Sequence, residues 1–382
     1  MAAYILRRLL LIIPTLLGIM ALNFAIIQFA PGGPIEQIIA EVQDGGGATD
    51  RFAGAQDAGA AAGADSAYRG AQGLDPDFLA RLEIEFNFAR LVCAEGYVGE
   101  PDVASPECEK QAIPIWERFV LMIGDYAVFD FGESFFRSVS VIDLILEKMP
   151  VSITLGLWTT LVSYLVSIPL GIAKAVRDGS RFDAVTSGII IAAYAIPGFL
   201  FAVILLVLFA GGSFAQIFPL RGLASDNADQ MSLVGQVLDY LWHIVLPVTA
   251  MAISGFATLT LLTKNSFLDE IRKQYVMTAR AKGLGENAVL YGHVFRNAML
   301  IVVSGFPAAF IAIFFTGALF VETVFSLDGL GLLGFEAVVN RDYPVVLGTL
   351  YLFGLIGLVA KLLTDLTYVL IDPRIDFARR EG

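Results

Sequence analysis

Six long apolar segments constrain this chain more than any other feature of its sequence. Each is near or above the ~20 residues that a helix needs to cross the ~30 Å hydrocarbon core of a bilayer. They are residues 9–30, 151–175, 185–210, 243–263, 298–321 and 345–370. Hydrophobic residues make up 57% of the 382 residues and charged residues only 16%, more apolar surface than a soluble core of this size can hide. We therefore predict an all-α polytopic membrane protein with six transmembrane helices.

Lys and Arg residues in the short connections predict the orientation, because cytoplasmic loops carry an excess of positive charge. With the N-terminus inside, cytoplasmic segments hold 14 of the 25 basic residues, and the two short external loops hold one each. Both termini are thus predicted to be cytoplasmic. The first apolar segment is longer than a signal peptide requires and is followed by Pro31, so we predict an uncleaved first helix.

The connection 31–150 is predicted to be a large external domain between the first two helices. It holds 21 acidic and 8 basic residues, and this acidity either keeps an exported domain soluble or concentrates cationic ligands. Residues 44–73, with 8 Gly and 10 Ala, are predicted to be a flexible linker. Two amphipathic helices are predicted beyond it, in "DPDFLARLEIEFNFARL" with Asp75 as N-cap and in "IPIWERFVLMIGDYAVF"; they lie on the membrane surface or pack on each other.

The predicted domain organisation therefore has four parts. Residues 1–30 form the N-terminal tail and first helix, residues 31–150 the external domain, and residues 151–370 a five-helix core. Residues 371–382 form a cytoplasmic tail.

Cys93 and Cys108 are the two cysteines of the chain, and both fall in the external loop. An oxidising compartment favours a disulfide between them. The alternative is a pair of free thiols in a reducing compartment, which would require the opposite topology.

The sequence predicts no catalytic site and no metal site. None of the seven lysines follows a glycine, so the chain has no phosphate-binding G-K-[ST] loop, and it has no G-x-S-x-G elbow. Two histidines cannot complete a zinc site, and the net charge of −12 gives no footprint for nucleic acid. A transporter subunit, a channel or a membrane scaffold remains.

The segment 265–297 is the longest predicted cytoplasmic connection within the core. Apolar side chains repeat at helical spacing, at Phe267, Leu268, Ile271, Tyr275, Val276 and Ala279. Gly283 and Gly285 then interrupt the pattern, as glycines after a helix do. We predict a helix–turn–helix able to transmit a push; the alternative is a membrane-surface loop without a partner.

The string "YVMTARAKGL", residues 275–284, resembles the coupling loop of ABC importer permeases. Met277, Thr278 and Ala279 stand where many such loops have Glu-Ala-Ala, and Gly283 matches the loop glycine; the departure at Met277 removes the polar role of that Glu. The strings "YILRRLLLIIPTLLGI", "APGGP", "HIVLPV", "HVFRNAM", "TGALFVETVFSLDGLGLL" and "DPRI" are similar to other parts of the dipeptide/oligopeptide/nickel permease group. Within that group, "KNSFLDEIRKQYV", "FAGGS" and "FPLRGL" resemble Yej-type permeases, and residues 91–112 match least.

The resemblance implies a type I ABC importer permease fold in the bacterial inner membrane, with residues 31–150 in the periplasm. It implies partners: a second homologous permease, an ATPase subunit with two nucleotide-binding domains that holds ATP and Mg, a periplasmic peptide-binding protein, and membrane lipid. The implied substrates are oligopeptides or peptide-like compounds of the microcin C type. The residues implied to couple to the ATPase are Tyr275, Met277, Thr278, Ala279, Arg280, Ala281, Lys282 and Gly283.

Three other functions remain open at this stage. The first is import of a nickel chelate by the same fold. The second is a passive channel or signalling receptor, which would need no coupling loop. The third is export instead of import.

Ionisable residues within predicted spans mark functional sites, because burying them in a bilayer is costly. We predict that Glu322 lines the external gate near Asp328 and Arg341, although such charges also serve as interface residues. Lys361 and Asp365, four residues apart in the last span, either lie on the translocation path or form an i,i+4 ion pair inside the bundle.

Overall fold

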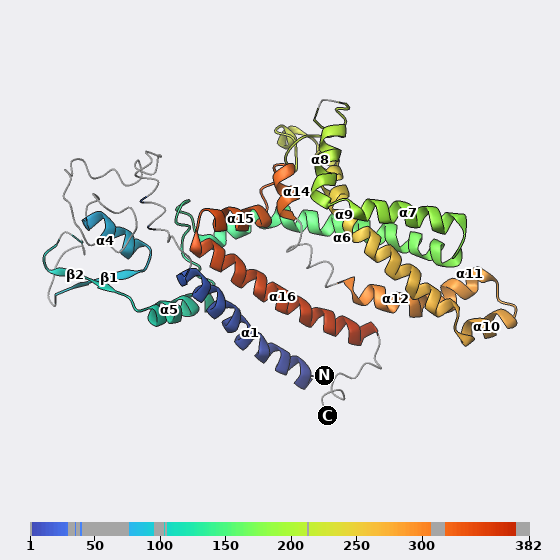
Figure 1. The fold of residues 1–382 in the computed structure, drawn as a ribbon, viewed down its shortest axis with the longest axis horizontal. Coiled ribbons are helices and arrows are strands. Elements are labelled where there is room, and N and C mark those ends of the chain that lie inside the picture. Colours follow the sequence, from blue (N-terminus) through green and yellow to red (C-terminus); the bar gives the residue numbers. More distant parts are fainter. Residues whose placement is uncertain are drawn as a thin grey trace. The chain divides into compact units, whose positions relative to one another are not determined.

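The computed structural model describes residues 2–29, 35, 39, 76–94, 103, 105–211, 214–306 and 318–371 (Figure 1). The chain divides into two compact units. The first comprises residues 1–12, 145–335 and 355–382, and the second comprises residues 13–144 and 336–354. Four helices contribute to both units: α1 (Ala2–Phe29), α6 (Val141–Val176), α15 (Leu330–Val339) and α16 (Tyr343–Ile371).

Four of the described helices are long and apolar enough to cross a membrane, and a bent pair would make a fifth. The four segments are Tyr4–Gln28, Val141–Val176, Leu233–Ile253 and Tyr343–Thr367. They overlap the predicted first, second, fourth and sixth spans. The predicted fifth span begins in α12 (Phe295–Ser304) and ends in α14 (Ala318–Val324), but residues 307–317 lie outside the described residues, so six spans stay a prediction.

The predicted third span is not one helix but two, α7 (Arg181–Ala195) and α8 (Gly198–Phe209), bent by 96°. Proline 197 has no backbone N–H, and its ring pushes the preceding residue out of the helical region. Ile196 accordingly takes φ −85° and ψ 121°. The single continuous helix predicted from the apolar run is therefore wrong at Pro197.

In the described part of the first unit, two apolar clusters hold the helices together. One joins α6, α8, α14 and α9 (Leu233–Ile271) through buried side chains such as Leu155, Leu205 and Ile244. The other gathers around the fully buried Phe267 near the C-terminal end of α9. Between α6 and α9 the approach is close, because a Cβ on Gly171 would lie 2.6 Å from the Cβ of Thr263. Only glycine permits this contact.

The second unit contains a small β-hairpin, which corrects the all-α prediction. Strand β1 (Ala89–Cys93) pairs antiparallel with β2 (Cys108–Ala112), after α4 (Pro76–Glu85). The helix predicted over residues 75–91 ends at Glu85 because Asn87 takes φ +58° and the next residues pair with a distant strand. Asp75, the predicted N-cap, lies outside the described residues. The predicted apolar face is confirmed, since Leu82 of α4 and Phe86, just after its end, are buried.

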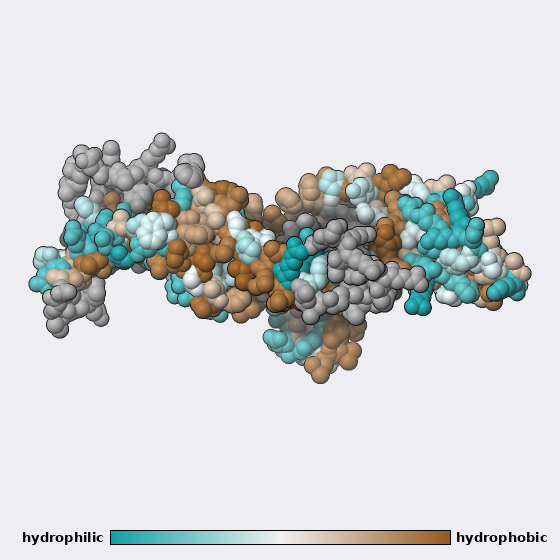
Figure 2. Space-filling model, turned by 90° about the horizontal axis from the view of Figure 1, so that it is seen from below, coloured by the Kyte–Doolittle hydropathy of each residue, from teal (hydrophilic) through white to brown (hydrophobic). Residues whose placement is uncertain are grey.

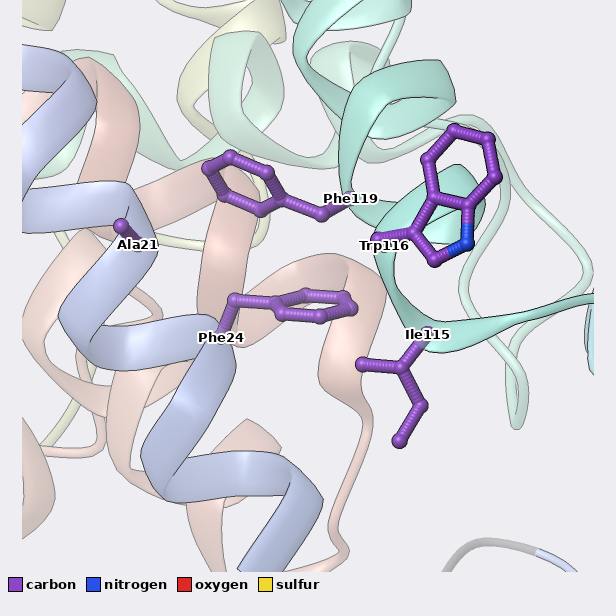
Figure 3. Close-up of a pocket in the computed structure, with 5 residues that line it drawn as sticks. All are labelled: Ala21, Phe24, Ile115, Trp116 and Phe119. Atoms are coloured by element: carbon purple, nitrogen blue, oxygen red, sulfur yellow. The ribbon is translucent and has the colours of Figure 1, made fainter.

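Helix α5 (Ile115–Ala127) is the second predicted amphipathic helix, and it borders an apolar groove beside α1 (Figure 3). Ala21 and Phe24 of α1 form one wall, and Ile115, Trp116 and Phe119 of α5 form the other. The rings of Phe24 and Phe119 lie 5.4 Å apart, whereas 70% of Trp116 is exposed.

Candidate functional site

The predicted coupling segment begins as a direct continuation of α9, which reaches Ile271 (Figure 1). After a two-residue break, α10 (Gln274–Ala281) follows, and then α11 (Glu286–Val289), the π-helix η2 (Leu290–Val294) and α12. The predicted helix–turn–helix is present, but its first helix is divided in two: Phe267–Ile271 belong to α9, and Tyr275–Ala279 belong to α10. Only residues 272 and 273 separate α10 from α9, so a displacement of α10 reaches α9 through this short break.

A glycine ends α10, as predicted. Gly283 takes φ +81°, its N–H donates to the carbonyl of Arg280, and the N–H of Leu284 donates to that of Ala279. These two bonds form a Schellman motif, in which a residue with positive φ is nearly always glycine. Gly285 has another role than predicted, because with φ −66° it precedes α11 as its N-cap.

The inner face of α10 is fixed on the apolar cluster around Phe267. Val276 is fully buried there and Ala279 nearly so, packed with Val289 and Val294 from the second half of the turn. The outer side exposes Met277, Thr278, Arg280, Ala281, Lys282 and Gly283. Figure 2 shows hydrophilic residues gathered over the end of the first unit that carries α10 and α11. A helix held on one face and free on the other can accept a partner and pass on its movement.

Tyr275 differs from the other predicted coupling residues because it points into the segment. Its hydroxyl donates to Glu270 Oε2 at 2.7 Å and accepts from Asn297 Nδ2 at 3.2 Å. Burial raises the pKa of the Tyr275 hydroxyl. Glu270 also pairs with Lys273, and this hydrogen bond raises the pKa of that ammonium. Tyr275 therefore connects the end of α9 with the start of α12 and orients α10 between them.

Glu322, a residue of α14, is fully buried, and its side chain contacts the N-terminus of α15. Its Oε2 accepts from the backbone N–H of Leu332 at 2.8 Å, and its Oε1 accepts from the Ser152 hydroxyl at 3.3 Å. Ser152 Oγ in turn accepts from the N–H of Leu330 at 2.9 Å. These two side chains thus satisfy amides that a helix leaves unpaired at its start. Sequence reasoning missed Ser152, whose role depends on a residue 170 positions away.

Two glycines let the chain wrap around that carboxylate. A Cβ on Gly329 would lie 2.5 Å from Cδ of Glu322, and a Cβ on Gly331 would lie 3.0 Å from its Oε2. The "DGLGLL" string therefore encloses Glu322.

The other predicted path residues are only partly brought together. Asp328 lies in the same unit as Glu322 and forms an ion pair with Lys148. Lys148 is buried, with 8% of it exposed, and sequence reasoning missed it as well. Arg341 belongs to the second unit. Glu322 as a gate residue stays a prediction, and the structure gives its carboxylate the contacts of a helix cap.

Asp365 takes a partner other than the one predicted. Its Oδ2 lies 2.7 Å from Nη1 of Arg8 and 3.1 Å from the donating hydroxyl of Tyr4. Within the described residues, no Lys361–Asp365 ion pair forms, and the side chain of Lys361 is exposed. The i,i+4 pair is therefore wrong, because a cation of α1 lies closer to Asp365 than Lys361 does.

A disulfide joins Cys93 and Cys108 in the structure. The two cysteines are directly opposite each other at the end of the β1–β2 ladder.

The sequence of this chain matches a known protein family and several named relatives. Residues 167–377 match the family described as "Binding-protein-dependent transport system inner membrane component". The chain is 58% identical over 386 residues to the peptidoglycan transport system permease protein YejB of Agrobacterium fabrum. It is 55% identical over 388 residues to the inner membrane ABC transporter permease protein YejB of Escherichia coli O157:H7; both alignments cover 100% of both chains.

More distant relatives carry the names of peptide transporters. The chain is 29% identical over 380 residues to the oligopeptide transport system permease protein AppB of Bacillus subtilis, with 99% of this chain and 100% of the relative covered. It is 28% identical over 391 residues to the dipeptide transport system permease protein DppB of Escherichia coli K12, with 98% and 99% covered. The chain therefore belongs to the inner membrane components of binding-protein-dependent transport systems, as a multi-pass ABC transporter permease of the peptide transport group.

Proposed function

We propose that this chain is the permease subunit through which short peptides and peptide-like compounds enter the bacterial cytoplasm. The observation that carries the proposal is α10, which is fixed on a buried cluster by Val276 and Ala279 and presents a free outer side around Met277. On this proposal, the outer side docks on an ATPase subunit with two nucleotide-binding domains, which holds the ATP and Mg. Closure of those domains moves α10 and switches the helices between inward-open and outward-open states.

The proposed assembly contains two further proteins. A second, homologous permease completes the pathway, and a periplasmic binding protein delivers the substrate. The chain has both termini in the cytoplasm and residues 31–150 in the periplasm, in keeping with the Lys and Arg of its short cytoplasmic connections.

The names of the relatives guide the substrate class. One is named for peptidoglycan, and others for oligopeptides or dipeptides. Peptide backbone is the chemistry common to these substrates, since peptidoglycan carries short peptide stems. We therefore include peptides released from peptidoglycan, and peptide-like compounds of the microcin C type, in the proposed substrates.

The test is ATP-driven uptake by the complete complex in proteoliposomes. Met277→Asp alters the exposed side of α10 without touching its buried face, so ATPase co-purification and uptake of a labelled oligopeptide should both fall. Leu220→Asp is the matched control. Leu220 is, like Met277, an exposed apolar residue, with 41% of it exposed, but it lies in the connection between α8 and α9. Unchanged attachment of the ATPase to Met277→Asp, or uptake of a nickel chelate without peptide uptake, would contradict the proposal.

A further inference from the structure

We propose that a partly buried cluster of charges, with Lys174 and Asp183 buried at its centre, locks the α6–α7 connection to the coupling segment, so that the two move as one body. The cluster consists of Lys174, Asp178, Asp183, Lys264 and Arg272, all in the first unit. The inference rests on the proposed function and adds positioning residues to it, none of which lies on the exposed side of α10.

Lys174 fastens the end of α6 to the start of α7. Its side chain is fully buried, and its Nζ donates to the Asp183 carbonyl at 3.0 Å and to the hydroxyls of Thr186 and Ser187 at 2.8 Å each. Nζ also lies 3.0 Å from Asp183 Oδ1. A buried ammonium is stable only when it is paired and hydrogen-bonded, so separating these two helices would leave a costly bare charge.

Lys264 fastens α9 to the same connection. Its Nζ lies 2.7 Å from Oδ2 of Asp183 and 3.0 Å from Oδ1 of Asp178. Arg272, which caps the C-terminus of α9, adds a longer contact of 3.6 Å to Asp178. The Asp183 carboxylate is therefore shared between a cation of α6 and a cation of α9.

The position of the cluster along the chain gives it a mechanical role. Lys264 lies within the part of α9 that runs on to Ile271 and, after the two-residue break, into α10. Asp183 lies in the first turn of α7, which leads to the bend at Pro197. A push on α10 is thus carried through α9 and the cluster into α7, because the helices cannot separate without exposing unpaired buried charges.

Distance measurements between spin labels test whether the two parts move together. The chain has no free cysteine, since Cys93 and Cys108 are bonded, so labels attach only at introduced sites. One label is placed at Arg181→Cys and one at Asn287→Cys, both at exposed positions. In the complete complex with Lys264 present, the label distance should be the same in the nucleotide-free and ATP-bound states. With Lys264→Met it should differ between the states; a native distance that changes with nucleotide would overturn the proposal.

Transport supplies a second readout. Lys264→Met should lower the amount of peptide taken up per ATP hydrolysed by at least about fivefold, which is the lower end of the usual coupling between two sites. The ATPase should still co-purify. Asp178→Asn, a milder change at a side chain that is 38% exposed, should give an intermediate loss, and Lys264→Arg should restore much of it. Arg137→Met is the matched control, because it removes a 2.6 Å ion pair with Glu336 in the second unit.

The two proposals fail in different ways. A native complex without ATP-driven peptide uptake refutes the proposed function. A native complex that transports, together with a Lys264→Met complex of equal coupling ratio, refutes the role of the cluster.

Discussion

Replacing Glu322 by alanine should destabilise the chain because it removes the cap of α15. The change leaves the partly buried N–H of Leu332, at the start of α15, without its acceptor at 2.8 Å and the buried Ser152 hydroxyl without its acceptor at 3.3 Å. An unsatisfied buried donor costs ~1–3 kcal/mol, and loss of a helix N-cap costs ~1 kcal/mol. We expect a loss of about 3 kcal/mol in the free energy of unfolding, and a smaller loss for Glu322→Gln, whose amide oxygen can still accept.

The glycines around Glu322 allow a sharper test. Gly329→Ala places a Cβ where it meets the Glu322 carboxyl group, so by itself it should cost ~1–3 kcal/mol as an overpacked site. In the double variant Glu322→Ala/Gly329→Ala the colliding group is gone. The double variant should therefore be more stable than the sum of the single losses predicts, by ~1–3 kcal/mol.

Thermal unfolding of the purified protein in detergent measures these effects. At roughly 2 °C per kcal/mol for a chain of this size, Glu322→Ala should lower the midpoint by about 6 °C. Additive losses in the double variant would refute the cap geometry. A Glu322→Gln variant with native stability and no peptide uptake would instead support the gate role predicted from the sequence.

Three further predictions concern a turn, a disulfide and an apolar helix. Gly283→Ala should lower stability by about 1 kcal/mol because alanine disfavours φ +81°. Gly285→Ala, at φ −66° with open space around it, should strain nothing and cost only the weaker preference for alanine as an N-cap, in the same thermal assay. Replacing Cys93 and Cys108 by serine should cost the hairpin ~3 kcal/mol on the chain-entropy view, measured as faster amide exchange in β1 and β2; unchanged exchange would count against it. In a Trp158→Phe/Trp242→Phe background, brominated lipid should quench the fluorescence of Trp116, because its exposed ring extends the apolar surface of α1. Quenching by aqueous iodide alone would show that Trp116 faces water instead.

Features that depend on local sequence were predictable. The long apolar helices follow from segment length, because lipid leaves the backbone few alternatives to a helix. The buried face of α10 follows from the spacing of Val276 and Ala279, and the end of that helix follows from Gly283.

Features decided by distant contacts were not predictable. Proline alone does not reveal the bend at Pro197, since Pro150 and Pro247 lie inside helices. The strand Ala89–Cys93 follows a helical pattern and is fixed by pairing with residues from position 108 onward. Glu322 has its hydrogen-bond partners on segments that only the fold brings near it.

The disulfide at the loop end of the β1–β2 ladder makes the strand pairing independent of the residues between its cysteines. The pairing of Cys93 with Cys108 sets the strand register, whatever lies in the 14 positions between them. Doubling such an intervening stretch adds only about 0.6 kcal/mol of closure entropy. Insertions or deletions between the two cysteines should therefore leave the pairing of β1 with β2 unchanged.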